Sequence, residues 1–313
     1  MNCDEGRPLS APGRRTPAVR IGPWEAVAAE GGGIVSLDGD RLAVASQAHL
    51  VVWRGQRRLG AAEAPWPAPG RPRFLGSRVL WGPGVLDLTS GNYAALAAAQ
   101  PEIWPGGGER PHVHAWSTLG ERLLVSYSTR DPARPTRVVL LDGFSGRTVF
   151  TRWHSDALPP EAAWVGRDVA AVGFRDLELL DAATGAARGR VALGAGTVTR
   201  LDADAEERFL VAVDLNRAIF SIDLQTGQIV DRWNGAWLDA AVAPDGHLVV
   251  ALDLAGRLHF ASRTGGRFRL LGEAAAAQPG SVALDRGVLA VAGGGIAARA
   301  KLAIDYPEGD GGE

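Results

Sequence analysis

Short apolar runs alternate with turn residues along most of this chain. Between residues 208 and 233, for example, short polar or glycine-containing stretches separate the runs Arg208–Val213, Ala218–Asp223 and Gln228–Trp233. Runs of this length that are rich in Val, Ile, Leu and Phe and bounded by turn residues are typical of β-strands. No segment shows a convincing helical periodicity, so the pattern predicts an all-β protein.

A turn motif, Asp-x-x-Ser/Thr-Gly, recurs directly after such apolar runs. A glycine at the end of a tight reversal supplies the positive φ that the turn needs, and the Asp and Ser/Thr side chains accept hydrogen bonds from turn N–H groups. We therefore expect the four aspartates to be structural, one in each repeat and too far apart to act as a catalytic pair. The motif occupies Asp87–Gly91, Asp142–Gly146, Asp181–Gly185 and Asp223–Gly227.

The repeats predict a β-propeller. Each repeat contains about four short strands, and the first strands recur with a mean spacing of about 41 residues, as in propeller blades. One four-stranded antiparallel sheet cannot bury both of its faces, so such units stack around an axis. The chain is expected to form a seven-bladed β-propeller over residues 17–307. The predicted first strands begin near Ile34, Phe74, Ala115, Ala163, Val198, Trp237 and Ser281.

The last repeat has only three predicted strands, Ser281–Leu284, Val288–Ala292 and Ala300–Tyr306. Two β-capable stretches, Ala18–Ile21 and Trp24–Ala29, remain unassigned at the other end of the chain. One of them is expected to supply the missing outer strand, so that an N-terminal strand closes the ring and removes a free sheet edge. Residues 1–16 and the acidic residues 308–313 are expected to be flexible tails.

Composition narrows the classes of partner. The chain of 313 residues has a formal net charge of −2 and a pI of about 6.3, which disfavours nucleic acid and membrane surfaces as partners. Its apolar runs are far shorter than the roughly 20 residues that span a bilayer. Residues 1–20 carry charges where an export signal has an apolar core, so we expect a cytoplasmic protein. A single cysteine, Cys3, excludes an internal disulfide.

Several repeats resemble known propeller families. Leu180–Gly185 and Ile222–Trp233 resemble the repeats of quinoprotein-type (PQQ-like) propellers, whereas Leu50–Arg54 and Ala243–Val250 resemble WD-repeat blades. Both resemblances imply the propeller fold, and such repeats serve binding scaffolds as well as enzymes. A small propeller with degenerate blades is also similar to the propeller component of bacterial ternary systems. That similarity implies a MoxR-type (AAA+) ATPase and a von Willebrand A domain protein as partners.

One pair of histidines is a candidate metal site. In a regular strand, His112 and His114 face the same side and could bind one zinc ion together with His154 or Asp156. Ordinary strand or loop polarity also explains these histidines and is the favoured interpretation. The chain has neither a Gly-x-Ser-x-Gly nucleophile elbow nor a glycine run followed by Gly-Lys-Ser/Thr. We therefore expect no catalytic, cofactor or metal site.

These observations favour a non-catalytic scaffold or adaptor that binds other proteins. The alternative is a propeller hydrolase, acting on lactones or glycans, with its site at the central channel. Such an enzyme needs several acids or histidines at the mouths of first strands, and Asp202 and Asp239 are the only acids suggested there.

Long insertions predict where a partner binds. They occupy Ala97–Pro111, Thr129–Thr136 and His154–Glu161, on the face that carries the loops between second and third strands and the connections between blades. Aromatic and arginine side chains are enriched at interface hot spots. The predicted partner-binding residues are Trp104, His112, His114, Arg130, Arg134 and His154.

Overall fold

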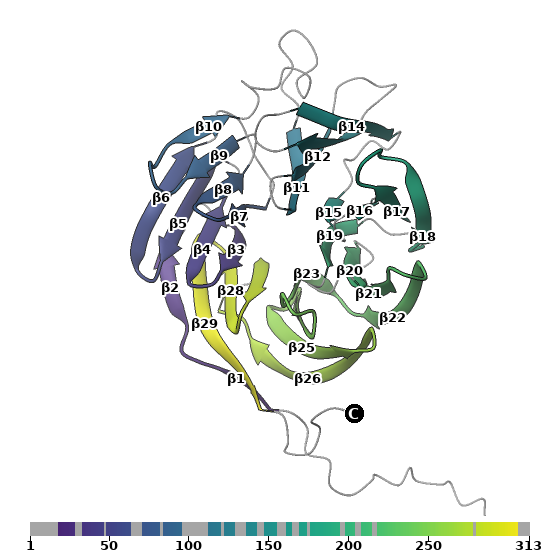
Figure 1. The fold of residues 1–313 in the computed structure, drawn as a ribbon. Coiled ribbons are helices and arrows are strands. Elements are labelled where there is room, and N and C mark those ends of the chain that lie inside the picture. Colours follow the sequence, from purple (N-terminus) through teal and green to yellow (C-terminus); the bar gives the residue numbers. More distant parts are fainter. Residues whose placement is uncertain are drawn as a thin grey trace, which may run out of the picture.

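The described part of the chain consists almost entirely of β-strands and the turns that connect them, as the sequence predicts (Figure 1). The structure is a computed structural model. It describes residues 18–28, 33–46, 48–63, 71–81, 84–95, 112–119, 122–128, 136–142, 147–154, 161–164, 169–173, 176–194, 198–203, 208–214, 218–277 and 280–305. The two expected tails, 1–16 and 308–313, lie outside these residues.

Most strands form four-stranded antiparallel sheets whose members follow one another in the sequence. Sheet I contains β3 (Ile34–Asp38), β4 (Arg41–Ala45), β5 (His49–Arg54) and β6 (Arg57–Glu63). Sheet II contains β7 (Arg73–Leu75), β8 (Arg78–Trp81), β9 (Gly84–Asp87) and β10 (Tyr93–Ala95). Sheet III contains β11 (His112–Leu119), β12 (Arg122–Ser128), β13 (Thr136–Asp142) and β14 (Arg147–His154).

The same order continues in the second half of the chain. Sheet IV contains β15 (Glu161–Trp164), β16 (Val169–Gly173), β17 (Asp176–Asp181) and β18 (Ala187–Ala192). Sheet V contains β19 (Val198–Ala203), β20 (Phe209–Asp214), β21 (Ala218–Asp223) and β22 (Gln228–Asn234). Sheet VI contains β23 (Trp237–Val242), β24 (Leu248–Asp253), β25 (Arg257–Thr264) and β26 (Arg267–Ala275).

Sheet VII joins strands from the two ends of the described chain. Its consecutive strands are β27 (Ser281–Asp285), β28 (Val288–Gly293) and β29 (Ile296–Asp305). Both β1 (Ala18–Ile21) and β2 (Glu25–Ala28) pair antiparallel with β29. β1 pairs with its last four residues and β2 with its first four. The sequence predicted one N-terminal strand here, whereas the structure uses both segments in succession along one long partner.

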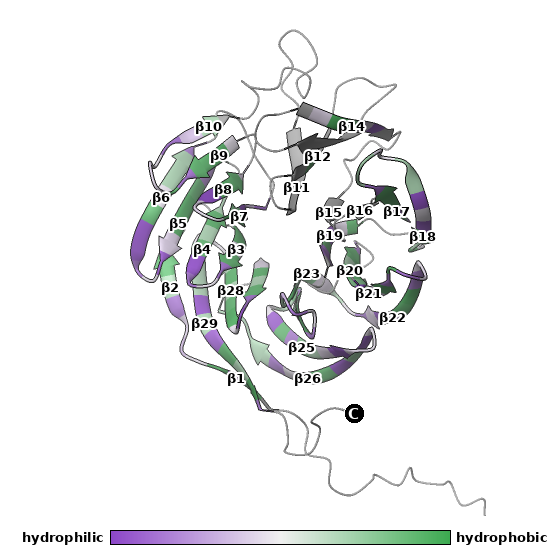
Figure 2. Ribbon diagram, viewed as in Figure 1, coloured by the Kyte–Doolittle hydropathy of each residue, from purple (hydrophilic) through white to green (hydrophobic). Residues whose placement is uncertain are grey.

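The sheets are arranged around a common centre, with the first strand of each sheet nearest to it (Figure 1). The core lies between neighbouring sheets. Phe220 and Leu210 of sheet V share a buried cluster with Leu179 of sheet IV, and Val35 of sheet I packs with Ala290 of sheet VII. The middle strand β20 of sheet V is buried on both faces and has no exposed residue along its length. Hydrophobic residues accordingly concentrate on inner and middle strands such as β3 and β28 (Figure 2).

The turn motif has the structure that its residues predict. In the turn after β17, the side-chain Oδ1 of Asp181 accepts hydrogen bonds from Ala183 N and Thr184 N. Gly185 has a φ of 71° and donates its N–H to the Asp181 carbonyl at 2.8 Å. The motifs at Asp87 and Asp223 repeat these contacts. The loop of the fourth motif, 143–146, lies outside the described residues.

Within the described part of the chain, no helix is long and apolar enough to cross a membrane.

Candidate functional site

The predicted partner-binding residues fall partly outside the described chain. Trp104, Arg130 and Arg134 lie outside it. His112 begins β11 and pairs in register with Ser128, and His154 ends β14 and pairs with Thr136. Because Ser128 pairs with Thr136, these four residues form one row across sheet III. The two histidines stand at opposite edges of the sheet, with their backbones roughly 14 Å apart at about 4.8 Å per strand.

The metal hypothesis assumed an uninterrupted strand through the His-x-His pair. The pairing register of β11 shifts between Val113 and Ala115, so His114 has no partner residue on β12. Such a bulge breaks the strict alternation of side chains, which was the reason to place both imidazoles on one face. Asp156, one of the proposed third ligands, lies outside the described residues.

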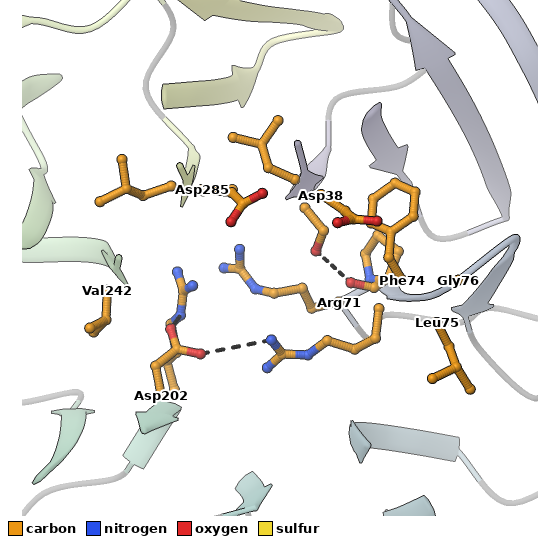
Figure 3. A pocket seen from close by; sticks show the side chains of 15 residues that line it. Asp38, Arg71, Phe74, Leu75, Gly76, Asp202, Val242 and Asp285 are labelled. Atoms are coloured by element: carbon orange, nitrogen blue, oxygen red, sulfur yellow. Dashed lines mark hydrogen bonds and ion pairs between the residues drawn. The ribbon is translucent and has the colours of Figure 1, made fainter. Parts of the chain in front are cut away.

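The structure brings a different set of charged residues together, around a central cavity. The cavity has a volume of about 400 Å³ and is lined from the inner strands β3, β7, β19, β23 and β27 (Figure 3). Phe74, Leu75, Val242 and Leu284 provide apolar parts of its wall. Its charged lining residues are Asp38, Arg71, Arg73, Arg200, Asp202 and Asp285.

Two β-bulges direct charged side chains toward this centre. The register of β19 shifts around Thr199, and that of β23 shifts around Leu238. In both strands the extra residue is exposed, whereas the next residue, Arg200 or Asp239, is only 8% exposed. A bulge re-aims the side chains that follow it, which explains why inner strands carry buried charges here.

Asp239 is the hub of a buried hydrogen-bond network. Its Oδ2 accepts hydrogen bonds from Arg71 Nη2 at 2.7 Å, Ser281 Oγ at 3.0 Å and Val282 N at 2.8 Å. Its Oδ1 accepts from Arg200 Nη1 at 3.2 Å and from Ala240 N at 2.9 Å. Both oxygens are therefore occupied by donors.

The two arginines extend this network to other sheets. Arg71 Nη1 donates to the carbonyls of Val35 at 2.8 Å and Val282 at 3.1 Å, in sheets I and VII. Arg200 Nε donates to Asp202 Oδ2 at 2.6 Å. Asp202 also forms a longer ion pair with Arg73, with 3.7 Å between Oδ1 and Nη1. One continuous network thus connects sheets I, II, V, VI and VII.

The electrostatics keep Asp239 ionised. Burial alone raises the pKa of its carboxyl, but the neighbouring Arg71 and Arg200 and the Val282 N–H together hold that pKa below its ordinary value. Burial and the nearby Arg200 lower the pKa of Arg71, whose guanidinium nevertheless stays protonated because its ordinary value lies far above neutrality. The centre therefore contains charged groups of both signs held in fixed positions.

Asp202 and Asp239 are the two acids that the sequence suggests for a site at the central channel. Asp202 lines the cavity and Asp239 lies in its network, as suggested for inner-strand acids. A general base must reach a substrate proton and accept it. The Asp239 oxygens are filled by five hydrogen bonds, and Asp202 is ion-paired with two arginines. Both acids are therefore engaged in contacts within the protein, and neither stands as a free general base.

Sequence reasoning missed Arg71, Arg73, Arg200 and Asp285. One local signal was present, because Arg200 and Asp202 alternate on a first strand where apolar residues are expected. The contact of Arg71 with Asp239 bridges 168 residues and leaves no local pattern.

Comparisons with known proteins identify the fold. A chain in the crystal structure of the mitotic checkpoint complex matches with a TM-score of 0.69 at 14% identity, covering 96% of this chain and 96% of that one. The WD40 β-propeller domain of Doa1 matches with a TM-score of 0.71 at 11% identity, covering 91% of this chain and 97% of that domain. No family model matches the chain, and no curated protein matches its sequence. At these identities the likeness concerns the fold alone, and it supports the coarser part of the prediction: the chain is a β-propeller repeat protein with a fold similar to that of WD40 propellers.

Proposed function

We propose that this propeller is a non-catalytic scaffold that binds other proteins. The observation that carries the proposal is the central network, in which the two candidate catalytic acids, Asp202 and Asp239, are held by arginines. Groups fixed in this way tie sheets together. The likeness to a chain of a multiprotein assembly, the mitotic checkpoint complex, also favours a role in protein association.

The proposal includes a particular architecture. The seven sheets act as seven blades, and the pairing of β1 and β2 with β29 closes the ring. A closed ring presents two rigid faces with loops of variable length, which suits a protein that holds partners in place. The partners implied by the sequence resemblance are a MoxR-type ATPase and a von Willebrand A domain protein.

We place the partner on the face that carries the turns between second and third strands. Two exposed leucines of sheet VI support this choice. Leu238 is 42% exposed and Leu254 is 48% exposed. Leu254 N donates to Ala236 O at 3.0 Å, so the turn after β24 lies against the connection that leads into β23. Exposed apolar side chains of this kind mark interaction surfaces when they cluster.

The first test replaces residues predicted to bind the partner. A tagged full-length chain carrying Trp104→Ala and Arg134→Ala should retain less of the ATPase and the von Willebrand A domain protein in pull-downs, with an unchanged melting temperature. Asp181→Ala, in a turn on the opposite face, is the control and should bind normally. Normal binding by the double variant would remove Trp104 and Arg134 from the proposed surface.

The second test uses residues that the structure describes. Leu238→Ser with Leu254→Ser should weaken the same pull-down, because it removes exposed apolar area from the proposed face. Leu270→Ser is the matched control, since Leu270 is 51% exposed but lies on the outer strand β26. Metal analysis tests the rival class, because stoichiometric calcium or zinc in the purified protein would contradict the scaffold proposal.

A further inference from the structure

Arg73 has unused hydrogen-bonding capacity in the central cavity. Its guanidinium carries five N–H donors. Its one ion pair in the described chain is that with Asp202, in which Nη1 and Oδ1 are 3.7 Å apart, longer than a hydrogen bond. Its Nε atom is buried and has no hydrogen-bond partner among the described residues. A buried donor without a partner is unfavourable, so Arg73 is suited to receive an anionic group.

Asp285, on another wall of the same cavity, is a buried carboxylate that lacks a positively charged partner among the described residues. Asp285 is 8% exposed, and its Oδ2 accepts one hydrogen bond, from Gly39 N at 2.5 Å. No arginine, lysine or histidine in the described part of the chain forms an ion pair with it. The neighbouring Asp38, in contrast, pairs with Arg41. A buried carboxylate without a counter-ion favours the binding of a cation.

Arg73 and Asp285, the two groups that lack a partner, lie at different places around one cavity. In Figure 3, Asp38 and Asp285 stand on one side, Asp202 with its ion pair to Arg73 stands on the other, and Arg71 lies between them. The volume of about 400 Å³ falls within the roughly 300–1,000 Å³ that small-molecule sites occupy. Phe74, Leu75 and Val242 add an apolar portion to the lining.

We propose that the central cavity binds a small zwitterion, an α-amino acid, with its carboxylate on Arg73 and its ammonium group on Asp285. One such ligand supplies both missing partners and keeps the net charge of the cavity unchanged. A simple anion would leave Asp285 without a cation, and a simple cation would leave the Nε donor of Arg73 without an acceptor. The apolar lining receives the ligand side chain. This site is additional to the protein-binding role and does not depend on it.

Direct binding to the folded full-length protein tests the proposal. Each of the twenty proteinogenic α-amino acids is titrated at up to millimolar concentration by calorimetry. Every binder is compared with the carboxylic acid that lacks its amino group and the amine that lacks its carboxylate. Because each analogue loses one charge-assisted contact, both should bind about tenfold more weakly or worse.

Variants assign the two charges to residues. Arg73→Met and Asp285→Asn should each weaken amino-acid binding by about tenfold or more, whereas Arg73→Lys should retain part of it. Arg54→Met is the matched control, because Arg54 pairs with Asp40 on the surface, where its side chain is 56% exposed. Circular dichroism establishes that each variant is folded, and the analogue comparison in the unmodified protein stands even if one variant does not fold.

Three results would overturn the proposal. One is that no amino acid binds at millimolar concentration. Another is that the acid or amine analogue binds as tightly as the parent amino acid, which would indicate a simple ion site. The last is that an acetylated and amidated Lys-Glu dipeptide binds while free amino acids do not, which would assign the cavity to a segment of a partner protein. Failure of this kind leaves the pull-down experiments of the scaffold proposal unaffected.

Discussion

Asp239 shows how much of this fold can depend on one carboxylate. It accepts five hydrogen bonds, which come from two arginines, a serine hydroxyl and two backbone N–H groups. Asp239→Ala would leave Arg71 and Arg200 as buried cations without their shared anion. We expect a loss of about 3–5 kcal/mol in the free energy of unfolding, measured by urea denaturation. Asp305→Asn, which breaks an exposed pair with Arg20, should cost less than about 1 kcal/mol.

The same residue predicts a pH dependence. Because its pKa is lower in the folded state than its ordinary value, Asp239 contributes stability that is present above the unfolded pKa. This contribution is lost as the pH falls through the lowered folded pKa. The difference in unfolding free energy between the unmodified protein and Asp239→Asn should therefore shrink on acidification. A difference that grows toward low pH would contradict this account of Asp239.

Asp181 provides a second titration, on the surface. Hydrogen bonds from Arg188 and Thr184 lower its pKa to about 2. The stability that it contributes should be present above about pH 4, its ordinary pKa, and be lost as the pH falls toward 2. Arg188→Ala should raise this pKa, as measured by the carboxyl carbon shift in NMR titration. Arg190→Ala is the control, since Arg190 pairs with Asp176 instead.

Residues in local patterns were predictable, and residues that act through distant contacts were not. The turn aspartates Asp87, Asp181 and Asp223 bond to backbone groups two and three positions away, so their spacing reveals their role. Asp239 and Asp202 were suggested as inward acids because they lie on first strands. The contacts of Asp239 with Arg71 and Arg200 could not be deduced, because they connect separate sheets. The residues of the predicted docking surface remain a prediction.

At the scale of elements, five sheets share one irregularity between their third and outer strands. In sheets I, III, IV, V and VI, the register shifts by one residue near the turn that joins these strands. The extra residue lies on the outer strand. A repeated bulge increases local twist and lets the outer strand wrap around its sheet. Alternation of apolar and polar residues does not reveal it, because only a few residues lie between the shift and the turn.

The N-terminal strands yield a graded prediction. Deleting residues 1–15 removes no described strand and should leave the melting temperature unchanged. Deleting residues 1–23 removes β1, whose Val19 and Ile21 pack against the core of sheets VI and VII. Deleting residues 1–29 also removes Val27, which is 4% exposed and whose burial is worth roughly 1.5–3 kcal/mol. Melting temperatures should fall stepwise, and equal melting of all three proteins would show that the terminal pairing contributes nothing.

The sequence predicted only one of these strands as the partner because β29 is longer than its apolar pattern indicates. The predicted third strand began at Ala300, whereas β29 begins at Ile296. Gly294 and Gly295 adopt positive φ values of 58° and 84°, so the chain reverses there and the strand starts at once. Four additional residues give β2 a partner of its own.

At the scale of the whole molecule, the central network is a second set of contacts between sheets. The apolar clusters that form the main core lie between neighbouring sheets, away from this network. Buried ion pairs often contribute little net stability, and apolar replacements of similar size can preserve it. The combination Arg71→Met, Arg200→Met and Asp239→Leu should therefore be more stable to urea than Asp239→Ala alone. A triple variant less stable than that single variant would show that the network holds the ring together through its charges.

The fold could be predicted from the sequence because most sheets are built from strands that follow one another in the chain. The regular spacing of these strands indicates the repeat. The central cavity could not be read, since its shape depends on how several inner strands converge.

The pairing of β1 and β2 with β29 can form only after β29 has been synthesised. The partners of β1 and β2 lie about 285 residues further along the chain, as the contact of Arg20 with Asp305 shows. At a synthesis rate of about 5–20 residues per second, the first strands emerge roughly 15–60 s before their partner exists. During that interval their edges are available to other nascent chains. Slower initiation on each message, which keeps ribosomes further apart, should raise the yield of soluble protein more than slower elongation does.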